Sequence, residues 1–143
     1  YFVTPHVVKE IEGESIDSIY TTRRYTKVDK GHYEEVVQGM RSAVLGGTCR
    51  TANIPELEIC GKTGTAQNHG KDHSAFMGFA PMNKPKIAIA VYVENAGFGA
   101  TWAVPIASVL MEKYLKGTLS PERMKTVDEI SNTNLIQYGF KEY

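Results

Sequence analysis

The chain has 143 residues, of which 42% are hydrophobic and 22% charged, values typical of one globular domain with a hydrophobic core. Its 16 basic and 16 acidic residues give a formal net charge of zero without a basic block, so nothing favours nucleic acid as a partner. No apolar run approaches the roughly 18 residues that a membrane span needs. The chain begins at Tyr1 without a methionine, which suggests an excised or processed piece of a longer protein.

The first 26 residues carry weak signals of regular structure. Residues 5–12 alternate imperfectly between apolar and polar side chains and predict a short strand. Residues 13–26 are polar and predict a loop or an irregular hairpin, in which Arg23 and Arg24 are expected to be surface charges.

A helix is predicted from about Lys30, because Asp29 can cap its first turn and Gly46-Gly47 can end it. Its apolar residues recur at the spacing of one helix face, which predicts a buried stripe. The stripe consists of Tyr33, Val36, Val37, Met40 and Val44.

Three segments, residues 59–67, 74–80 and 86–94, are predicted to be strands. Because the connections between them are short, they predict an antiparallel meander. The third segment is apolar on both faces, as in a sheet that helices cover on each side.

The rest of the chain predicts a loop and two helices. Residues 95–101 contain Gly97 and Gly99 and predict a flexible loop. A helix with Pro105 in its first turn follows and ends at Gly117, and Ser120 can cap a second, short helix. The first of these helices should be largely buried across the sheet, because only one narrow stripe of it is polar. That stripe is Ser108, Glu112 and Lys116.

The cysteines and histidines do not predict a metal site. Cys49 and Cys60 are too few for a disulfide framework; pairing stays open, but buried free thiols are the expectation. His69 and His73 have the spacing of a metal pair on a helix, but Gly70 favours a loop there. No cysteine or carboxylate motif completes the set, so no metal ligands are assigned.

The densest group of chemically active side chains lies in residues 59–67, Ile-Cys-Gly-Lys-Thr-Gly-Thr-Ala-Gln. A nucleotide-binding P-loop would need a glycine five positions before Gly61, where the chain has Glu56. It would also need a helix to follow, which Gly64 disfavours. The segment is therefore better interpreted as a strand.

As a strand, this segment places the hydroxyls of Thr63 and Thr65 side by side on one face, an arrangement suited to binding a carboxylate. Lys62 adds a positive charge, and Gly64 lets the backbone of a ligand approach closely. An edge position in the sheet would let both faces reach one cleft. The alternative is an ordinary edge strand with an exposed lysine.

The Lys-Thr-Gly segment stands among four further segments in a recognisable order. These are Thr4-Pro5-His6-Val7-Val8-Lys9, residues 72–81, residues 86–95 and Pro105-Ile106-Ala107. With them the chain resembles the class B penicillin-binding proteins, and among these the elongation type, penicillin-binding protein 2. The resemblance covers roughly residues 3–117, and residues 118–143 add nothing to it.

The resemblance implies an α+β fold, an antiparallel sheet with helices packed on its faces, of the type shared by penicillin-binding proteins and serine β-lactamases. Residues 1–117 would be the C-terminal portion of a transpeptidase domain, and thus a partial domain. Residues 118–143 would be a C-terminal tail with a short helix to about Ile130, loosely held from residue 131 on.

The resemblance also implies a serine acyltransferase that cross-links peptidoglycan stem peptides and is trapped by β-lactams. The expected catalytic residues are Lys62, for positive potential and proton transfer, and Thr65, whose backbone N–H would be an oxyanion-hole donor. The expected substrate-binding residues are Thr63, Gly64 and Thr65, around the terminal carboxylate. The mechanism implies no metal and no organic cofactor.

The family's Ser-x-x-Lys and Ser-x-Asn motifs occur nowhere in the chain. In the family they lie upstream of the part that this chain resembles, so the chain alone is expected not to react with penicillin or to cross-link. One alternative is a non-catalytic module that binds D-Ala-D-Ala or β-lactams, as in a sensor; another is a purely structural domain. A serine β-lactamase fits residues 65–67 and 79–81 less well.

The implied partners are stem peptides ending in D-Ala-D-Ala, β-lactam antibiotics and an elongation-complex glycosyltransferase. The implied location is the outer face of the bacterial cytoplasmic membrane, where an N-terminal span would anchor the parent protein. In the family, the strand at residues 86–94 pairs with a strand near the start of the domain. With that edge bare, we expect a homo-oligomer through residues 86–94.

Overall fold

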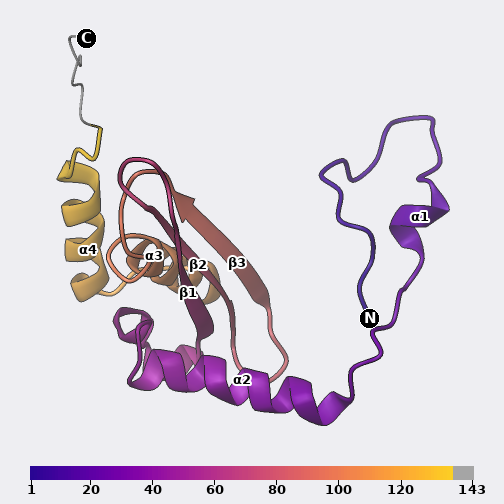
Figure 1. Ribbon diagram of the computed structural model, residues 1–143, viewed down its shortest axis with the longest axis horizontal. Coiled ribbons are helices and arrows are strands. Elements are labelled where there is room, and N and C mark those ends of the chain that lie inside the picture. Colours follow the sequence, from indigo (N-terminus) through magenta and orange to yellow (C-terminus); the bar gives the residue numbers. More distant parts are fainter. Residues whose placement is uncertain (137–143) are drawn as a thin grey trace. The chain divides into compact units, whose positions relative to one another are not determined.

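The structure, a computed structural model, describes residues 1–136 and divides into a unit of residues 1–33 and a unit that starts at Glu34 (Figure 1). In the first unit, Phe2 and Arg24 exchange two backbone hydrogen bonds of 2.8 Å. The chain between them is mostly irregular and contains the one-turn helix α1 (Ser18–Thr21). The loop predicted for residues 13–26 therefore carries one short helix.

The strand predicted at residues 5–12 is absent, and this prediction was wrong. Val7, Val8 and Ile11 are exposed, and no described residue pairs with the segment. A strand needs a neighbour that satisfies its backbone hydrogen bonds, and imperfect alternation alone does not supply one.

The second unit is built on an antiparallel meander, as predicted (Figure 1). Its strands are β1 (Cys60–Ala66), β2 (His73–Ala80) and β3 (Ile87–Val93), in the spatial order β1-β2-β3. Thr63 lies opposite Phe76, which lies opposite Val91. Strands β1 and β3 are thus the edges of the sheet formed by the described residues.

The three helices predicted after residue 29 are all present. They are α2 (Lys30–Leu45), α3 (Ala103–Lys116) and α4 (Pro121–Asn132), and the 3-10 turns η1 (Arg50–Ala52) and η2 (Pro55–Leu57) precede β1. Ser120 caps α4 by accepting from the Arg123 N–H, and Gly117 ends α3 in a left-handed conformation. The tail predicted at residues 131–143 lies outside the described residues from residue 137 on.

The core lies between α3, the inner face of the sheet and the turns η1 and η2. Both cysteines are buried free thiols, as predicted, and Cys49 belongs to this core. Its members are Val44, Cys49, Ala52, Ile54, Leu57, Ile59, Phe76, Ala80, Ala103, Val104, Ala107 and Met111.

The stripe predicted to be buried on α2 enters this core only at its C-terminal end, through Val44. Tyr33 and Val36 are exposed, so this part of the prediction was wrong. Arg41 helps to hold the buried end by donating from Nη1 to the carbonyl oxygen of Ile59 at 2.9 Å. Periodicity identifies the apolar face of a helix, but how much of that face is buried depends on the neighbouring elements.

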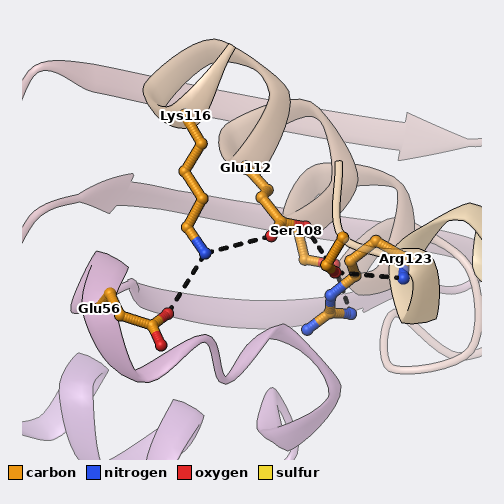
Figure 2. Close-up of polar contacts among 6 residues, drawn as sticks. Glu56, Ser108, Glu112, Lys116 and Arg123 are labelled. Carbon is orange, nitrogen blue, oxygen red and sulfur yellow. Dashed lines mark hydrogen bonds and ion pairs between the residues drawn. The ribbon is translucent and has the colours of Figure 1, made fainter. Parts of the chain in front are cut away.

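Helix α3 buries Ala107 and Met111 of its apolar face, as expected, but also part of its polar stripe. Ser108 and Glu112 of its polar stripe are 0% and 1% exposed, whereas Leu110 and Tyr114 are 49% and 65% exposed. Ser108 and Glu112 are buried because polar partners surround them, whereas Lys116 of the same stripe stays exposed (Figure 2). Lys116 lies 3.3 Å from Glu112 and 3.3 Å from a carboxylate oxygen of Glu56, and Ser120 donates to Glu112 at 3.5 Å.

Strand β3 is half-buried on one face and exposed on the other. Its inner residues contact α3, while Ala88, Ala90 and Tyr92 are exposed, so the prediction that both faces are covered was wrong. The predicted fold class is confirmed: a small antiparallel sheet with helices packed against it. In the part of the chain that the structure describes, no helix combines the length and the apolar character of a membrane span.

Candidate functional site

The candidate site is centred on β1, the edge strand that carries Lys62, Thr63, Gly64 and Thr65. Alternation along the strand puts Thr63 and Thr65 on the face of the buried Phe76, and Lys62 on the face of the exposed Met77. The lysine and the threonines therefore project from opposite faces. Because the strand is an edge, a ligand lying along it can reach both faces.

Lys62 crosses from its own face to the backbone of its neighbour. Its side chain is exposed, and Nζ donates a hydrogen bond of 2.9 Å to the carbonyl oxygen of Thr63. The ammonium is therefore held beside the backbone of Thr63, although the side chain remains exposed to solvent. An apolar groove formed by Met77, Ala90 and Tyr92 begins beside it on the same face of the sheet.

The two threonines differ in their surroundings. Thr65 is exposed, whereas the Thr63 hydroxyl is hydrogen-bonded to the hydroxyl of Thr48, with 2.8 Å between the oxygens. Thr48 belongs to the turn between α2 and η1, and nothing in the sequence singled it out. Its place after the Gly-Gly pair that ends α2 is the only signal, and it predicts a turn rather than a site.

A buried thiol lies directly behind this pair of hydroxyls. Cys49 is 0% exposed, and its Sγ lies 4.0 Å from the Thr48 hydroxyl. Burial raises the pKa of the Cys49 thiol, and hydrogen bonds to Thr48 and Thr63 and the charge of Lys62 offset only part of this rise. The thiol is therefore protonated at neutral pH and can act as a weak donor.

The loop at residues 95–101, predicted to be flexible, is fixed against the inner face of β1 and β2. An added Cβ on Gly99 would lie 2.3 Å from the Ala75 carbonyl oxygen and 2.6 Å from that of Gly64. The buried Ser74 holds the same loop, because its hydroxyl donates to the Phe98 carbonyl at 2.9 Å and accepts from the Ala103 N–H at 3.1 Å. Only glycine permits this approach.

The chain matches a known protein family over most of its length. The family model described as the penicillin-binding protein transpeptidase domain matches residues 1–112. The chain belongs to this family.

Two solved structures and one curated relative that resemble this chain belong to penicillin-binding proteins or D,D-transpeptidases. The chain is 36% identical to penicillin-binding protein 2 of Pseudomonas aeruginosa in complex with WCK 5153, with a TM-score of 0.65 over 85% of this chain and 28% of that one. It is 32% identical to a ceftriaxone acyl-enzyme of penicillin-binding protein A from Mycobacterium tuberculosis, with a TM-score of 0.56 over 68% and 24%. The peptidoglycan D,D-transpeptidase MrdA of Acinetobacter baumannii is 32% identical over 97% of this chain and 23% of the relative.

The expected resemblance to the class B proteins of the penicillin-binding protein 2 type is thus confirmed. The chain spans only 20% to 26% of the length of the curated relatives that it matches. The activity of the full-length relatives is therefore a proposal where this shorter chain is concerned.

His73, the first residue of β2, has a structural role beside the site. His73 accepts from the Asn95 N–H through Nδ1 at 3.0 Å, and its ring lies 5.3 Å from that of Tyr92. Asn68 donates to the Asn95 side chain at 3.0 Å and joins the two loops. Among residues 1–136, no three histidine, cysteine or acidic side chains come together in an arrangement that could hold a metal ion.

Proposed function

We propose that this chain supplies the ligand-binding strand of a peptidoglycan D,D-transpeptidase that cross-links stem peptides through a serine acyl-enzyme. The observation that supports the proposal most directly is the geometry of β1, with two threonines on one face and the Lys62 ammonium at the backbone between them. Family membership and relatives that are named peptidoglycan D,D-transpeptidases support it as well.

In this proposal, Thr63 and Thr65 donate hydrogen bonds to the carboxylate of D-Ala-D-Ala or of a β-lactam. Hydrogen bonds to an ionised acceptor are roughly twice as strong as neutral ones, so two hydroxyls suffice to select a terminal carboxylate. Lys62 adds positive potential and assists proton transfer, and Gly64 lets the ligand backbone lie close. The Thr65 N–H is one donor to the oxyanion.

The nucleophile in this proposal is a serine outside the 143 residues, since the chain contains no Ser-x-x-Lys. That serine attacks the carbonyl of the penultimate D-alanine, the last D-alanine leaves, and an amine of a neighbouring stem peptide takes the acyl group. The reaction takes place on the outer face of the cytoplasmic membrane, beside an elongation-complex glycosyltransferase. It needs no metal or organic cofactor.

The test is labelling of the complete native protein by a fluorescent penicillin. We expect stoichiometric labelling of the native protein, and a loss of labelling rate of about tenfold or more in Lys62→Ala and Thr63→Val. Lys71→Ala, which removes an exposed lysine from the neighbouring loop, is the control and should label normally. A complete protein that does not label would refute the transpeptidase proposal.

A second candidate is a non-catalytic module that binds D-Ala-D-Ala or β-lactams reversibly. Such a module would bind the carboxylate with the same Thr63 and Thr65 hydroxyls and the Lys62 ammonium beside them, without using a nucleophile. The two candidates differ in one measurement: the module would bind a D-Ala-D-Ala peptide reversibly and never form a covalent adduct. In both, the chain alone is not labelled by penicillin, so covalent labelling of the 143-residue chain would contradict both.

A further inference from the structure

Thr48 is held in place on both sides by the turn to which it belongs. An added Cβ on the preceding residue, Gly47, would lie 2.8 Å from the Cα of Ala43, so the turn is folded tightly against α2. The following residue, Cys49, is buried, and its N–H donates to the Ala43 carbonyl at 3.0 Å. The Thr48 hydroxyl is thus presented to Thr63 from a fixed backbone.

This hydroxyl does not serve the turn itself. The 3-10 turn η1 begins after Cys49 without a side-chain hydrogen bond to its backbone. Among the described residues, the Thr48 Oγ1 meets the Thr63 Oγ1 at 2.8 Å and the Cys49 Sγ at 4.0 Å. Its near polar partner is thus Thr63, and any role of the hydroxyl acts through that residue.

The direction of the bond between the two hydroxyls decides what Thr63 can offer to a ligand. A threonine hydroxyl donates one proton and can accept two hydrogen bonds. If Thr63 donated to Thr48, its proton would be unavailable to a carboxylate. If Thr48 donates to Thr63, the Thr63 proton is free to point at the ligand, and the accepted bond makes it a stronger donor. The Cys49 Sγ lies 4.0 Å from the Thr48 oxygen, and a thiol that donates to this oxygen would leave the Thr48 proton for Thr63.

We propose that Thr48 is a positioning residue: it donates to the Thr63 Oγ1 and so directs the Thr63 proton toward the carboxylate of a substrate or β-lactam. The inference rests on the proposed function, because it requires Thr63 to bind a carboxylate. Thr48 itself does not contact the ligand. Removing its hydroxyl should weaken reactions of ligands that carry the carboxylate and spare those of ligands whose carboxylate is masked.

The test compares Thr48→Val, Thr48→Ser and Thr63→Val in the complete native protein. For each variant, the second-order rate of acylation is measured with benzylpenicillin and with its methyl ester, by competition with a fluorescent penicillin. The readout is the ratio of the two rates, since a general loss of structure lowers both rates and leaves their ratio unchanged. Thr48→Ala repeats the comparison if Thr48→Val does not fold.

We expect Thr63→Val to lower the acid-to-ester ratio by about tenfold and Thr48→Val to lower it by about three- to fivefold. Thr48→Ser keeps the hydroxyl and should restore the ratio to within about twofold of the native value. A lowered ratio in Thr48→Ser equal to that of Thr48→Val would overturn the role of the hydroxyl.

The outcomes separate this inference from the proposed function. If Thr63→Val lowers the ratio and neither Thr48→Val nor Thr48→Ala does, Thr48 has no positioning role and the proposed function stands. If Thr63→Val also leaves the ratio unchanged, Thr63 does not bind the carboxylate, and both proposals lose that residue. If the native protein does not react with benzylpenicillin at all, both proposals fall.

Discussion

Arg123 of α4 donates a hydrogen bond of 2.9 Å from Nη1 to the main-chain carbonyl of Thr51 in η1. The same nitrogen lies 3.2 Å from the hydroxyl of the buried Ser108 on α3 (Figure 2). Helix α4 lies beyond the residues that the family model matches. It nevertheless holds η1, the turn that follows Thr48, in place. Helix α4 therefore stabilises a segment that adjoins the candidate site.

Replacing Arg123 by alanine should therefore destabilise the protein. The change removes two hydrogen bonds from a charged donor, those to the Thr51 carbonyl and to the Ser108 hydroxyl, at a cost of about 1–3 kcal/mol in the free energy of unfolding. Urea denaturation followed by circular dichroism measures it. Lys125→Ala, on the exposed side of the same helix, is the control and should stay within about 0.5 kcal/mol of the native protein.

Gly99→Ala should disturb the loop that lies against β1. The added methyl group would meet two backbone carbonyl oxygens, those of Ala75 and Gly64, neither of which can rotate away. We expect a loss of about 1–3 kcal/mol in stability, the usual cost of overpacking, and slower labelling by penicillin. Gly70→Ala is the matched control, because an added Cβ there meets nothing within 4 Å. Equal stability of the two variants would show that the loop is not tightly packed.

The carboxyl group of Glu56 should titrate below the usual range of a glutamate. Its pKa is lowered first by a hydrogen bond from its own backbone N–H and then by Lys116. Because the folded pKa lies below the unfolded one, the ionised carboxylate stabilises the fold above the unfolded pKa. That contribution is lost as the pH falls through the folded pKa. Titration of the side-chain carboxyl by NMR would measure the midpoint.

The variant Lys116→Ala separates the two causes. It should raise the Glu56 midpoint only part of the way to the usual value, since the backbone hydrogen bond remains. A complete return to the usual value would assign the whole shift to Lys116.

We expect the chain to self-associate through strand β3, as the sequence also predicted. It is an edge of the described sheet, and Ala88, Ala90 and Tyr92 expose a largely apolar face. We expect two copies of the chain to pair through residues 86–94, and Ala90→Lys to shift the population toward monomer by charging that face. Light scattering over a range of concentrations measures it, with Thr22→Lys as a control of equal charge. A native chain that stays monomeric at high concentration would argue against this pairing.

The local elements could be predicted because their signals lie within each segment. Residues 59–67 alternate and carry glycines, so strand β1 and its division into a lysine face and a threonine face follow from the sequence. The caps at Ser120 and Gly117 likewise set the boundary between α3 and α4. The Lys-Thr-Gly residues were recognised because their order among neighbouring segments is specific.

Burial could not be predicted in the same way, because it depends on partners far along the chain. Glu112 looked like part of a solvent-facing stripe, yet Ser120 and Lys116 enclose it. Thr48 stands 15 residues before Thr63, and no local pattern pairs two threonines across a turn and a strand. Gly99 belonged to a Gly-x-Gly that predicts flexibility, and only the close approach of Ala75 shows why a glycine is needed there.

The bond between the Lys62 ammonium and the Thr63 carbonyl fixes the position of the positive charge before any ligand arrives. An ammonium has three N–H donors, so the other two remain available while one stays on the carbonyl. A free lysine side chain would lose conformational entropy when a ligand immobilised it. In this strand, part of that entropy is already lost in the resting protein, so less of the binding free energy is spent on ordering the lysine.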